Sequence, residues 1–283
     1  MRTIGLFKLP GSTPDHEPSR GRDWRLIALP AKGARRGPSE RAIADSRLDA
    51  IAILGLGLRK TLYAEKALLS GKHVLVDFPL GHDFGEISRL EKIAEDRELC
   101  IYSPNLLRTE SGIQELKRMA SGSSGKILSL TITCGLNTRF ESSEWSMKLM
   151  QLLDLSEWIA ESRCVEAYGR KSTNHPSSVA LVVTLSFDSG VKTLLNLYSA
   201  PKNPMRLWID GIFEHSVAHV DPYAQTVRLS RFSDNTGETV NWAPSPLSIA
   251  IEDFVAHIRS EKRISLSDDL ERIFTLACNV LTN

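Results

Sequence analysis

In the first half of the chain, short apolar runs alternate with segments in which apolar residues recur every three or four positions. Short apolar runs are typical of buried strands in a parallel sheet, and the longer spacing is typical of amphipathic helices. Their alternation predicts an α/β domain with a Rossmann-like parallel sheet. We expect strands at 3–7, 25–29, 49–54, 73–76 and 99–102, and helices at 62–69, 85–97 and 111–121.

The second half has a different pattern, in which apolar and polar residues alternate along several segments. Asp188-Ser189-Gly190 separates two of them, and Asp and Gly suit the turn of a β-hairpin. We therefore expect a Rossmann-like domain at 1–122 and, at 123–283, an α+β domain with an open, mostly antiparallel sheet. The closing helices are candidates for packing back on the first domain. We expect strands at 127–134, 179–187, 191–198, 206–209, 216–220 and 226–230, and helices at 144–161, 249–259 and 268–282.

Composition narrows the class of protein. The 283 residues include 35 Lys and Arg against 34 Asp and Glu, and basic residues are not interleaved with aromatic ones, so we expect no nucleic-acid partner. No apolar run reaches the roughly 20 residues of a membrane helix, and the first residues lack an apolar signal segment, which predicts a cytoplasmic protein without membrane association. The four cysteines are scattered, which favours reduced thiols and no metal site.

The chain contains an ordered set of short motifs, which comprises Asp49-Ala50-Ile51-Ala52-Ile53, Gly71-Lys72-His73-Val74, Asp77-Phe78-Pro79, Asn105, Arg108, Gly122 and Gly125. This set resembles the glucose-fructose oxidoreductase / inositol dehydrogenase (Gfo/Idh/MocA) family. The resemblance is clearest over residues 49–134 and looser elsewhere, and it implies a two-domain NAD(P)-dependent oxidoreductase fold. It also implies a homo- or hetero-oligomer formed through the sheet of the second domain.

The cofactor loop departs from the family pattern. Family members carry Gly-x-Gly-x-x-Gly after the first strand, where the glycines let the backbone approach a pyrophosphate. Here residues 8–16 hold one glycine and two prolines, so the loop is either an altered phosphate site or a surface loop that has lost this role. Basic residues after the second strand suit the 2′-phosphate of NADP, with NAD as the alternative. The candidate cofactor residues are Gly11, Ser12, Thr13, Arg35, Arg36, Asp77, Pro79 and Asn105.

The two central catalytic positions also depart from the family. Phe78 stands where the family has a lysine beside the reacting carbon, and Gln151 stands where it has an acid–base histidine. A phenyl ring has no proton to give, and an amide does not titrate near neutral pH. Asp154 is retained and, with Arg108, is a candidate substrate-binding residue. Lys60 is a candidate for a place near the cofactor edge, but the favoured expectation is a lysine on the surface of a helix.

These departures leave three hypotheses for function. The first is a catalytically degenerate family member, a pseudoenzyme that acts as a partner or scaffold subunit. The second is an active NADP-dependent reductase of a non-sugar substrate, similar to biliverdin reductases, which have Glu-Tyr-Pro where this chain has Asp77-Phe78-Pro79. The third is a non-catalytic sensor of a small-molecule ligand.

Overall fold

The structure is a computed structural model, and the chain divides into two compact units that are described separately. The first unit comprises residues 1–106 and 245–272, and the second comprises 107–244 and 273–283. The residues that the structure describes are 2–8, 24–28, 40–55, 59–81, 84–120, 122, 124–137, 143–175, 178–199, 206–233, 237–241, 246–260 and 267–282.

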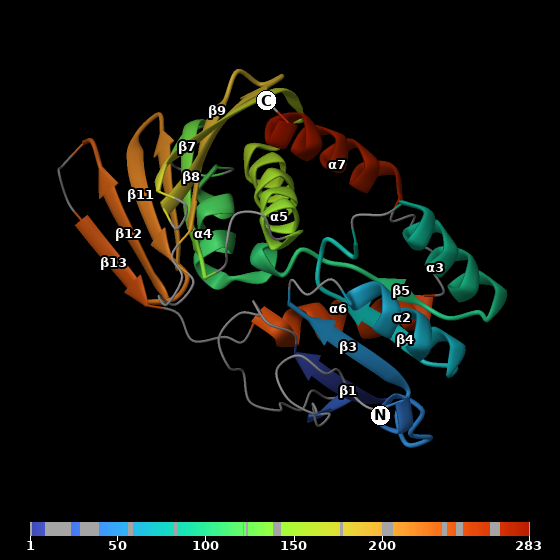
Figure 1. Cartoon of the computed structure of the whole chain (residues 1–283). Helices are drawn as coiled ribbons and strands as arrows, with labels where there is room; N and C mark the ends of the chain where they lie inside the picture. The colour runs from blue at the N-terminus through green and yellow to red at the C-terminus, as the bar shows by residue number, and fades with distance from the viewer. Residues whose placement is uncertain are drawn as a thin grey trace. The chain divides into compact units, whose positions relative to one another are not determined.

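The first unit contains a five-stranded parallel sheet in the order β2-β1-β3-β4-β5 (Figure 1). The chain adds β2 on one side of β1 and then returns to add β3 on the other, so the strand order reverses between β1 and β3. The elements are β1 (Arg2–Lys8), β2 (Trp24–Ala28), α1 (Glu40–Ile43), β3 (Ala50–Leu54), α2 (Lys60–Leu69), β4 (His73–Val76), α3 (Phe84–Asp96), β5 (Ile101–Tyr102) and α6 (Pro246–Ser260).

Strand β3 lies at the centre of this unit and is apolar at every position. All five of its residues are buried, as expected for a parallel strand that is covered on both faces. Helix α6 packs against the sheet, where Phe254 and Ile251 join Ile4 and Leu75 in one hydrophobic cluster. The last long helix before residue 267 therefore completes the core of the first unit.

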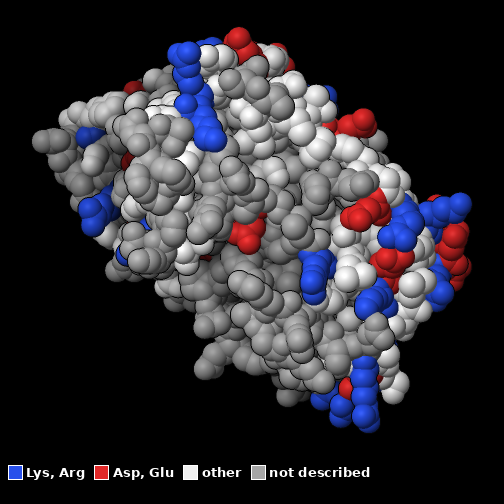
Figure 2. Space-filling model, in the orientation of Figure 1, with Lys and Arg blue, Asp and Glu red and all other residues white. Residues whose placement is uncertain are grey.

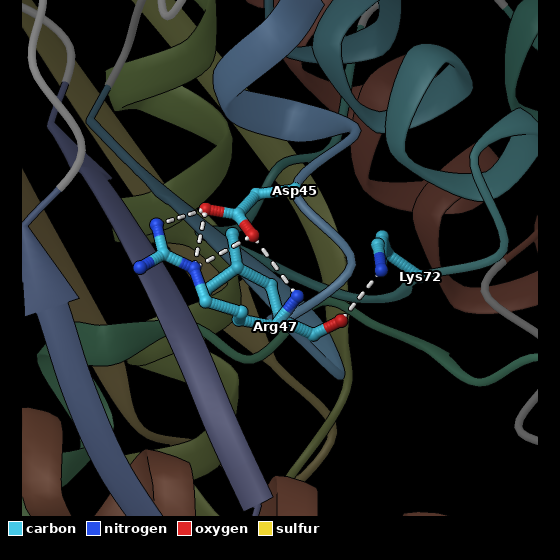
Figure 3. A network of polar contacts seen from close by, with 4 residues as sticks. Asp45, Arg47 and Lys72 are labelled. Carbon is cyan, nitrogen blue, oxygen red and sulfur yellow. Dashed lines mark hydrogen bonds and ion pairs between the residues drawn. The ribbon is translucent and has the colours of Figure 1, made fainter.

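A set of polar contacts fixes the segment that leads into β3 (Figure 3). Arg47 donates to Asp45 from its backbone nitrogen at 3.0 Å and from Nη2 at 2.6 Å, and this hydrogen bonding lowers the pKa of Asp45 to about 2. The buried Lys72 ammonium donates to the carbonyl of Leu48 at 2.6 Å. These contacts hold the turn at residues 45–48. The backbone nitrogen of Thr3 also donates to the Asp49 carboxylate at 2.6 Å, and this hydrogen bond places the start of β3 beside β1.

The second unit contains an eight-stranded sheet in the order β13-β12-β11-β10-β6-β9-β8-β7. Strands β6 and β9 run parallel, and the other neighbours are antiparallel. Helix α7 is shared, because residues up to Arg272 belong to the first unit. The elements are the 3-10 helix η1 (Leu106–Thr109), α4 (Ser111–Ala120), β6 (Ile127–Leu136), α5 (Ser143–Ala160), β7 (Cys164–His175), β8 (Ser178–Phe187), β9 (Lys192–Ser199), β10 (Arg206–Phe213), β11 (Ser216–Asp221), β12 (Thr226–Arg231), β13 (Gly237–Asn241) and α7 (Ser267–Thr282).

The strands of this sheet alternate between buried and more exposed positions. In β8, Val183 and Leu185 are buried, whereas Val182 and Thr184 are exposed. Helices α4 and α5 lie against the sheet, α4 on β11 and β12 and α5 on β6 (Figure 1). Gly169 of β7 lies close to α7, because a Cβ there would lie 2.6 Å from a methyl carbon of Val280.

The predicted fold class is confirmed, since a parallel Rossmann-like sheet is joined to a mixed, mostly antiparallel one. Strand β7 was not predicted from the sequence. It is an edge strand, and its charged residues Glu166, Arg170 and Lys171 are exposed. Such composition does not give the apolar alternation by which a strand is recognised. The short elements α1 and β13 were not predicted either.

Candidate functional site

The tripeptide Asp77-Phe78-Pro79 follows the carboxyl end of β4. The backbone nitrogen of Asp77 donates to the carbonyl of Ile53 at 3.0 Å, and that of Phe78 donates to the carbonyl of Pro104 at 3.0 Å. The peptide bond between Phe78 and Pro79 is cis. Asp77 and Phe78 are both buried. The tripeptide thus continues the sheet at its carboxyl edge, where open α/β sheets bind ligands.

Lys60, the first residue of α2, binds this tripeptide through hydrogen bonds to its carbonyls. Its side chain is buried, with 1% of the residue exposed, and Nζ donates to the carbonyl of Asp77 at 2.7 Å and to the carbonyl of Pro79. The expectation of a surface lysine was wrong, because two inward-facing carbonyls require donors and a lysine ammonium provides them. Lys60 therefore positions both ends of the tripeptide.

In the second unit, Arg108 and Asp154 form a two-pronged ion pair. Nε of Arg108 donates to Oδ2 of Asp154 at 2.9 Å, and Nη2 donates to Oδ1. Asp154 lies on α5, and its side chain is 12% exposed, whereas Arg108 lies on η1 with its side chain 36% exposed. The pair joins η1 to α5, so the two candidate substrate residues are brought together and bind each other.

Trp158, one turn after Asp154, lies next to two cations. The guanidinium carbon of Arg108 is 5.8 Å from the centre of an indole ring of Trp158, and Nζ of Lys117 is 5.4 Å from it. Lys117 also donates to the carbonyl of Trp158 at 2.7 Å and to the carboxylate of Glu161 at 2.5 Å. Cation–π contacts of this kind stabilise the link between α4 and α5.

Gln151, at the position of the family histidine, lies deep inside the second unit. Every residue of α5 from 147 to 156 is buried, and this stretch includes one lysine, Lys148. Nζ of Lys148 donates to Oε1 of Gln151 at 2.5 Å, and the two residues are 5% and 2% exposed. Lys148 was not among the predicted site residues. The signal for it is a lysine with apolar neighbours in a segment of helical period, since lysine is seldom fully buried.

Further titratable groups of the second unit have shifted pKa values. Burial raises the pKa of the Cys134 thiol on β6, and the nearby Lys148 lowers it. Burial, then Cys134 and Glu110, raise the pKa of the Tyr223 hydroxyl. Burial also raises the pKa of the Glu110 carboxyl to about 7. Of these three groups, Cys134 is the one whose pKa Lys148 affects.

The other predicted cofactor residues are placed only in part. Gly11, Ser12, Thr13, Arg35 and Arg36 lie outside the described residues. Asn105 is buried, with 5% of its surface exposed, in the segment after β5. His73 has a structural role, because its Nδ1 accepts a hydrogen bond from the backbone nitrogen of Cys100 at 3.0 Å.

The described part of the first unit fits a dinucleotide. The reversal of strand order between β1 and β3 creates the crevice at which such sheets bind nucleotides. Gly55, the residue after β3, has φ of 105°, a conformation that glycine adopts readily. In its strand order, the described part of this sheet therefore matches the sheets that bind dinucleotides.

Two features, a metal-binding cluster and a membrane-spanning helix, are absent from the described residues. Among the described residues there is no group of three or more His, Cys, Asp or Glu side chains that could hold a metal ion. No helix in the described ranges is long and apolar enough to cross a membrane. Figure 2 shows acidic and basic side chains next to one another on the face in view. Arg89 and Glu65 form an ion pair at 2.8 Å.

No protein-family model and no curated protein sequence matches the chain. Solved structures do match. UDP-N-acetylglucosamine 3-dehydrogenase GnnA from Acidithiobacillus ferrooxidans superposes with a TM-score of 0.68 at 19% identity, over 98% of this chain and 96% of that one. A putative NADPH-dependent oxidoreductase from Desulfitobacterium hafniense gives 0.71 at 12% identity, over 99% and 95% of the two chains.

Biliverdin reductase from Synechocystis sp. PCC 6803, solved with biliverdin and NADP+, is also similar, with a TM-score of 0.60 at 16% identity over 99% of this chain and 96% of that one. The chain has the two-domain fold of these dehydrogenases. At such identities the likeness establishes the fold, and the chemistry must be argued from the residues of this chain.

Proposed function

We propose that the protein is a divergent NADP-dependent reductase of the Gfo/Idh/MocA type that acts on a non-sugar substrate. The observation that carries this proposal is the tripeptide itself, which is buried and accepts hydrogen bonds from the ammonium of Lys60 at the carbonyls of Asp77 and Pro79. A buried cation is costly unless it is well hydrogen-bonded, so its presence directly under the tripeptide favours continued use of this turn.

The cofactor would be held at the carboxyl edge of the parallel sheet, where Asp77, Pro79 and Asn105 lie at the ends of β4 and β5. A reduced nicotinamide supplies a hydride when it is bound there. Arg35 and Arg36 are proposed to bind the 2′-phosphate that distinguishes NADP from NAD.

Phe78 replaces a proton donor with an aromatic ring. An aromatic ring at this position favours a flat, conjugated substrate, which is a substrate class unlike sugars. Hydride transfer depends on orientation, which a stacked ring provides without a charged group at position 78. The biliverdin and NADP+ bound to the Synechocystis enzyme are an example of such a pair on the same fold.

The test is steady-state oxidation of NADPH, with tetrapyrroles and small carbonyl compounds as substrates. We expect turnover with a flat, conjugated substrate, and we expect Phe78→Leu to raise KM for that substrate at least several-fold while NADPH binding is unchanged. Phe232→Leu is the matched control, because Phe232 is 59% exposed. Tight NADPH binding together with no turnover of any substrate in the panel would instead favour a small-ligand sensor.

A non-catalytic partner subunit is the second candidate, and Phe78 and Gln151 favour it because neither side chain titrates near neutral pH. In that role the exposed residues of the large sheet, such as Tyr168, Val182 and Ile212, would form the interface with a second copy or another chain. Light scattering would then show an oligomer, and the oligomer would dissociate on Val182→Glu while cofactor binding stayed absent.

A further inference from the structure

Lys148 is a cation in a buried stretch of α5, with apolar residues next to it in the sequence. Its neighbours Met147, Leu149 and Met150 are each 1% exposed or less, and Lys148 itself is 5% exposed. A helix that is buried on all sides normally carries apolar residues throughout. The ammonium therefore lies where the surrounding sequence provides a low-polarity environment.

The hydrogen bonds of this ammonium are incomplete. A lysine ammonium has three N–H donors, and within the described residues Oε1 of Gln151 is the acceptor that Nζ of Lys148 reaches. That amide oxygen is neutral. No carboxylate in the described part of the chain lies within 4.0 Å of Nζ, in contrast to Arg108, which pairs with Asp154.

The thiol of Cys134, the group whose pKa Lys148 affects, does not supply the missing negative charge. Burial raises the pKa of this thiol, which keeps it neutral at physiological pH. A buried charge without a partner of opposite sign is unfavourable, and a ligand with a negative charge would supply that partner.

We propose that Lys148 and Gln151 form an oxyanion subsite, in which the ammonium binds a carboxylate or phosphate group of the substrate. Gln151 accepts a hydrogen bond from Nζ and so holds the ammonium in place. The two residues are three positions apart on α5 and share one face of the helix. The assignment of this anion to the substrate rests on the proposed reductase function, whereas the oxyanion subsite itself does not.

The experiment measures thermal unfolding of the full chain with sodium malonate, with sodium phosphate, and with sodium chloride at equal ionic strength. We expect one of the two oxyanions to raise the Tm of the wild type by about 2–4 °C above chloride at a concentration well above its dissociation constant. A shift with malonate alone identifies a carboxylate, and a shift with phosphate alone identifies a phosphate.

Lys148→Met should abolish that shift. Lys192→Met is the matched control, because Lys192 is exposed and donates to one neutral oxygen, Oγ of Ser186, at 2.8 Å. Without ligand, Lys148→Met should unfold at the same temperature as the wild type or higher, since an unpaired buried cation is replaced by an apolar side chain of similar length. Gln151→Met, which keeps the lysine, should weaken oxyanion binding several-fold.

Three results would overturn the proposal: no shift in the wild type with either oxyanion, a shift retained in Lys148→Met, or a Lys148→Met variant that is strongly destabilised or fails to fold. The last would assign the lysine a structural role. A parallel titration with NADPH separates this proposal from the reductase function. Wild-type protein that binds malonate or phosphate but no NADPH contradicts the reductase function alone, and the converse contradicts the subsite alone.

Discussion

Lys60 in the first unit and Lys148 in the second are both almost fully buried, but their partners differ. Lys60 donates to two backbone carbonyls, of Asp77 and Pro79, whereas Lys148 donates to the side-chain oxygen of Gln151. The first lysine is held by groups that cannot move away from it, and it stabilises the chain's own turn. The second has donors left for a ligand. Burial alone therefore does not separate a structural lysine from a binding one, and the acceptors do.

The largest effect is expected for Lys60→Met. Removal of the ammonium leaves two buried carbonyls without this donor, and we expect the free energy of unfolding to fall by about 3–5 kcal/mol. Urea unfolding measures the change, with Lys92→Met, at an exposed position of α3, as the control. If Lys60→Met were as stable as the control, the ammonium of Lys60 would not stabilise the turn at residues 77–79.

A pH-dependent effect is expected at Glu110 in the second unit. Burial raises the pKa of its carboxyl from 4.5 to about 7, so the folded protein binds the proton more tightly than the unfolded chain does. The stability that this group contributes is present below pH 4.5 and is lost as the pH rises through 7, by at most about 3 kcal/mol.

Glu110→Gln should remove this loss. Urea unfolding at pH 5 and at pH 8 should show the wild type losing more stability than the variant between the two values. Equal losses in both proteins would mean that the Glu110 carboxyl ionises as readily in the folded chain as in the unfolded one.

A smaller effect is expected for the ion pair between Arg108 and Asp154, which is partly exposed on the arginine side. A double-mutant cycle with Arg108→Met and Asp154→Asn should give a coupling free energy of about 1–2 kcal/mol, because the geometry is two-pronged and one partner is largely buried. A coupling near zero would show that the pair does not join η1 to α5, and would leave both residues available to a substrate.

The smallest effect is expected at the surface pair of Asp45 and Arg47. Asp45→Asn should leave the urea midpoint at pH 7 unchanged within error, although Arg47 lowers the pKa of Asp45 to about 2, because solvent screens exposed pairs. A clear loss of stability would mean that the turn before β3 depends on this pair and that solvent does not screen it.

The backbone framework of both units could be predicted from the sequence, whereas the polar partners inside them could not. The apolar run of β3 and the turn signal Asp188-Ser189-Gly190 are local patterns, and local patterns determine local elements. Strand β7 was not predicted, because its position at the edge of the sheet allows charged residues and its sequence therefore lacks the apolar alternation of a strand.

The role of Lys60 depends on carbonyls at positions 77 and 79, which lie 17 and 19 residues further along the chain. No local pattern reports contacts at that distance. Lys148 differs, because its acceptor Gln151 is three residues away and the apolar sequence around it is visible without a structure. The sequence therefore contained the signal for the proposed binding lysine, and the structure was needed for the structural one.

The central claim, that the first unit still binds a nicotinamide cofactor, is tested most directly by calorimetric titration of the purified protein with NADPH and NADH, after any nucleotide carried from expression has been removed. The account predicts binding of NADPH in the micromolar range and weaker binding of NADH, with Arg35→Ala and Arg36→Ala reducing the preference. Absence of heat at millimolar concentrations of both cofactors would contradict it and would make the partner-subunit function the leading one.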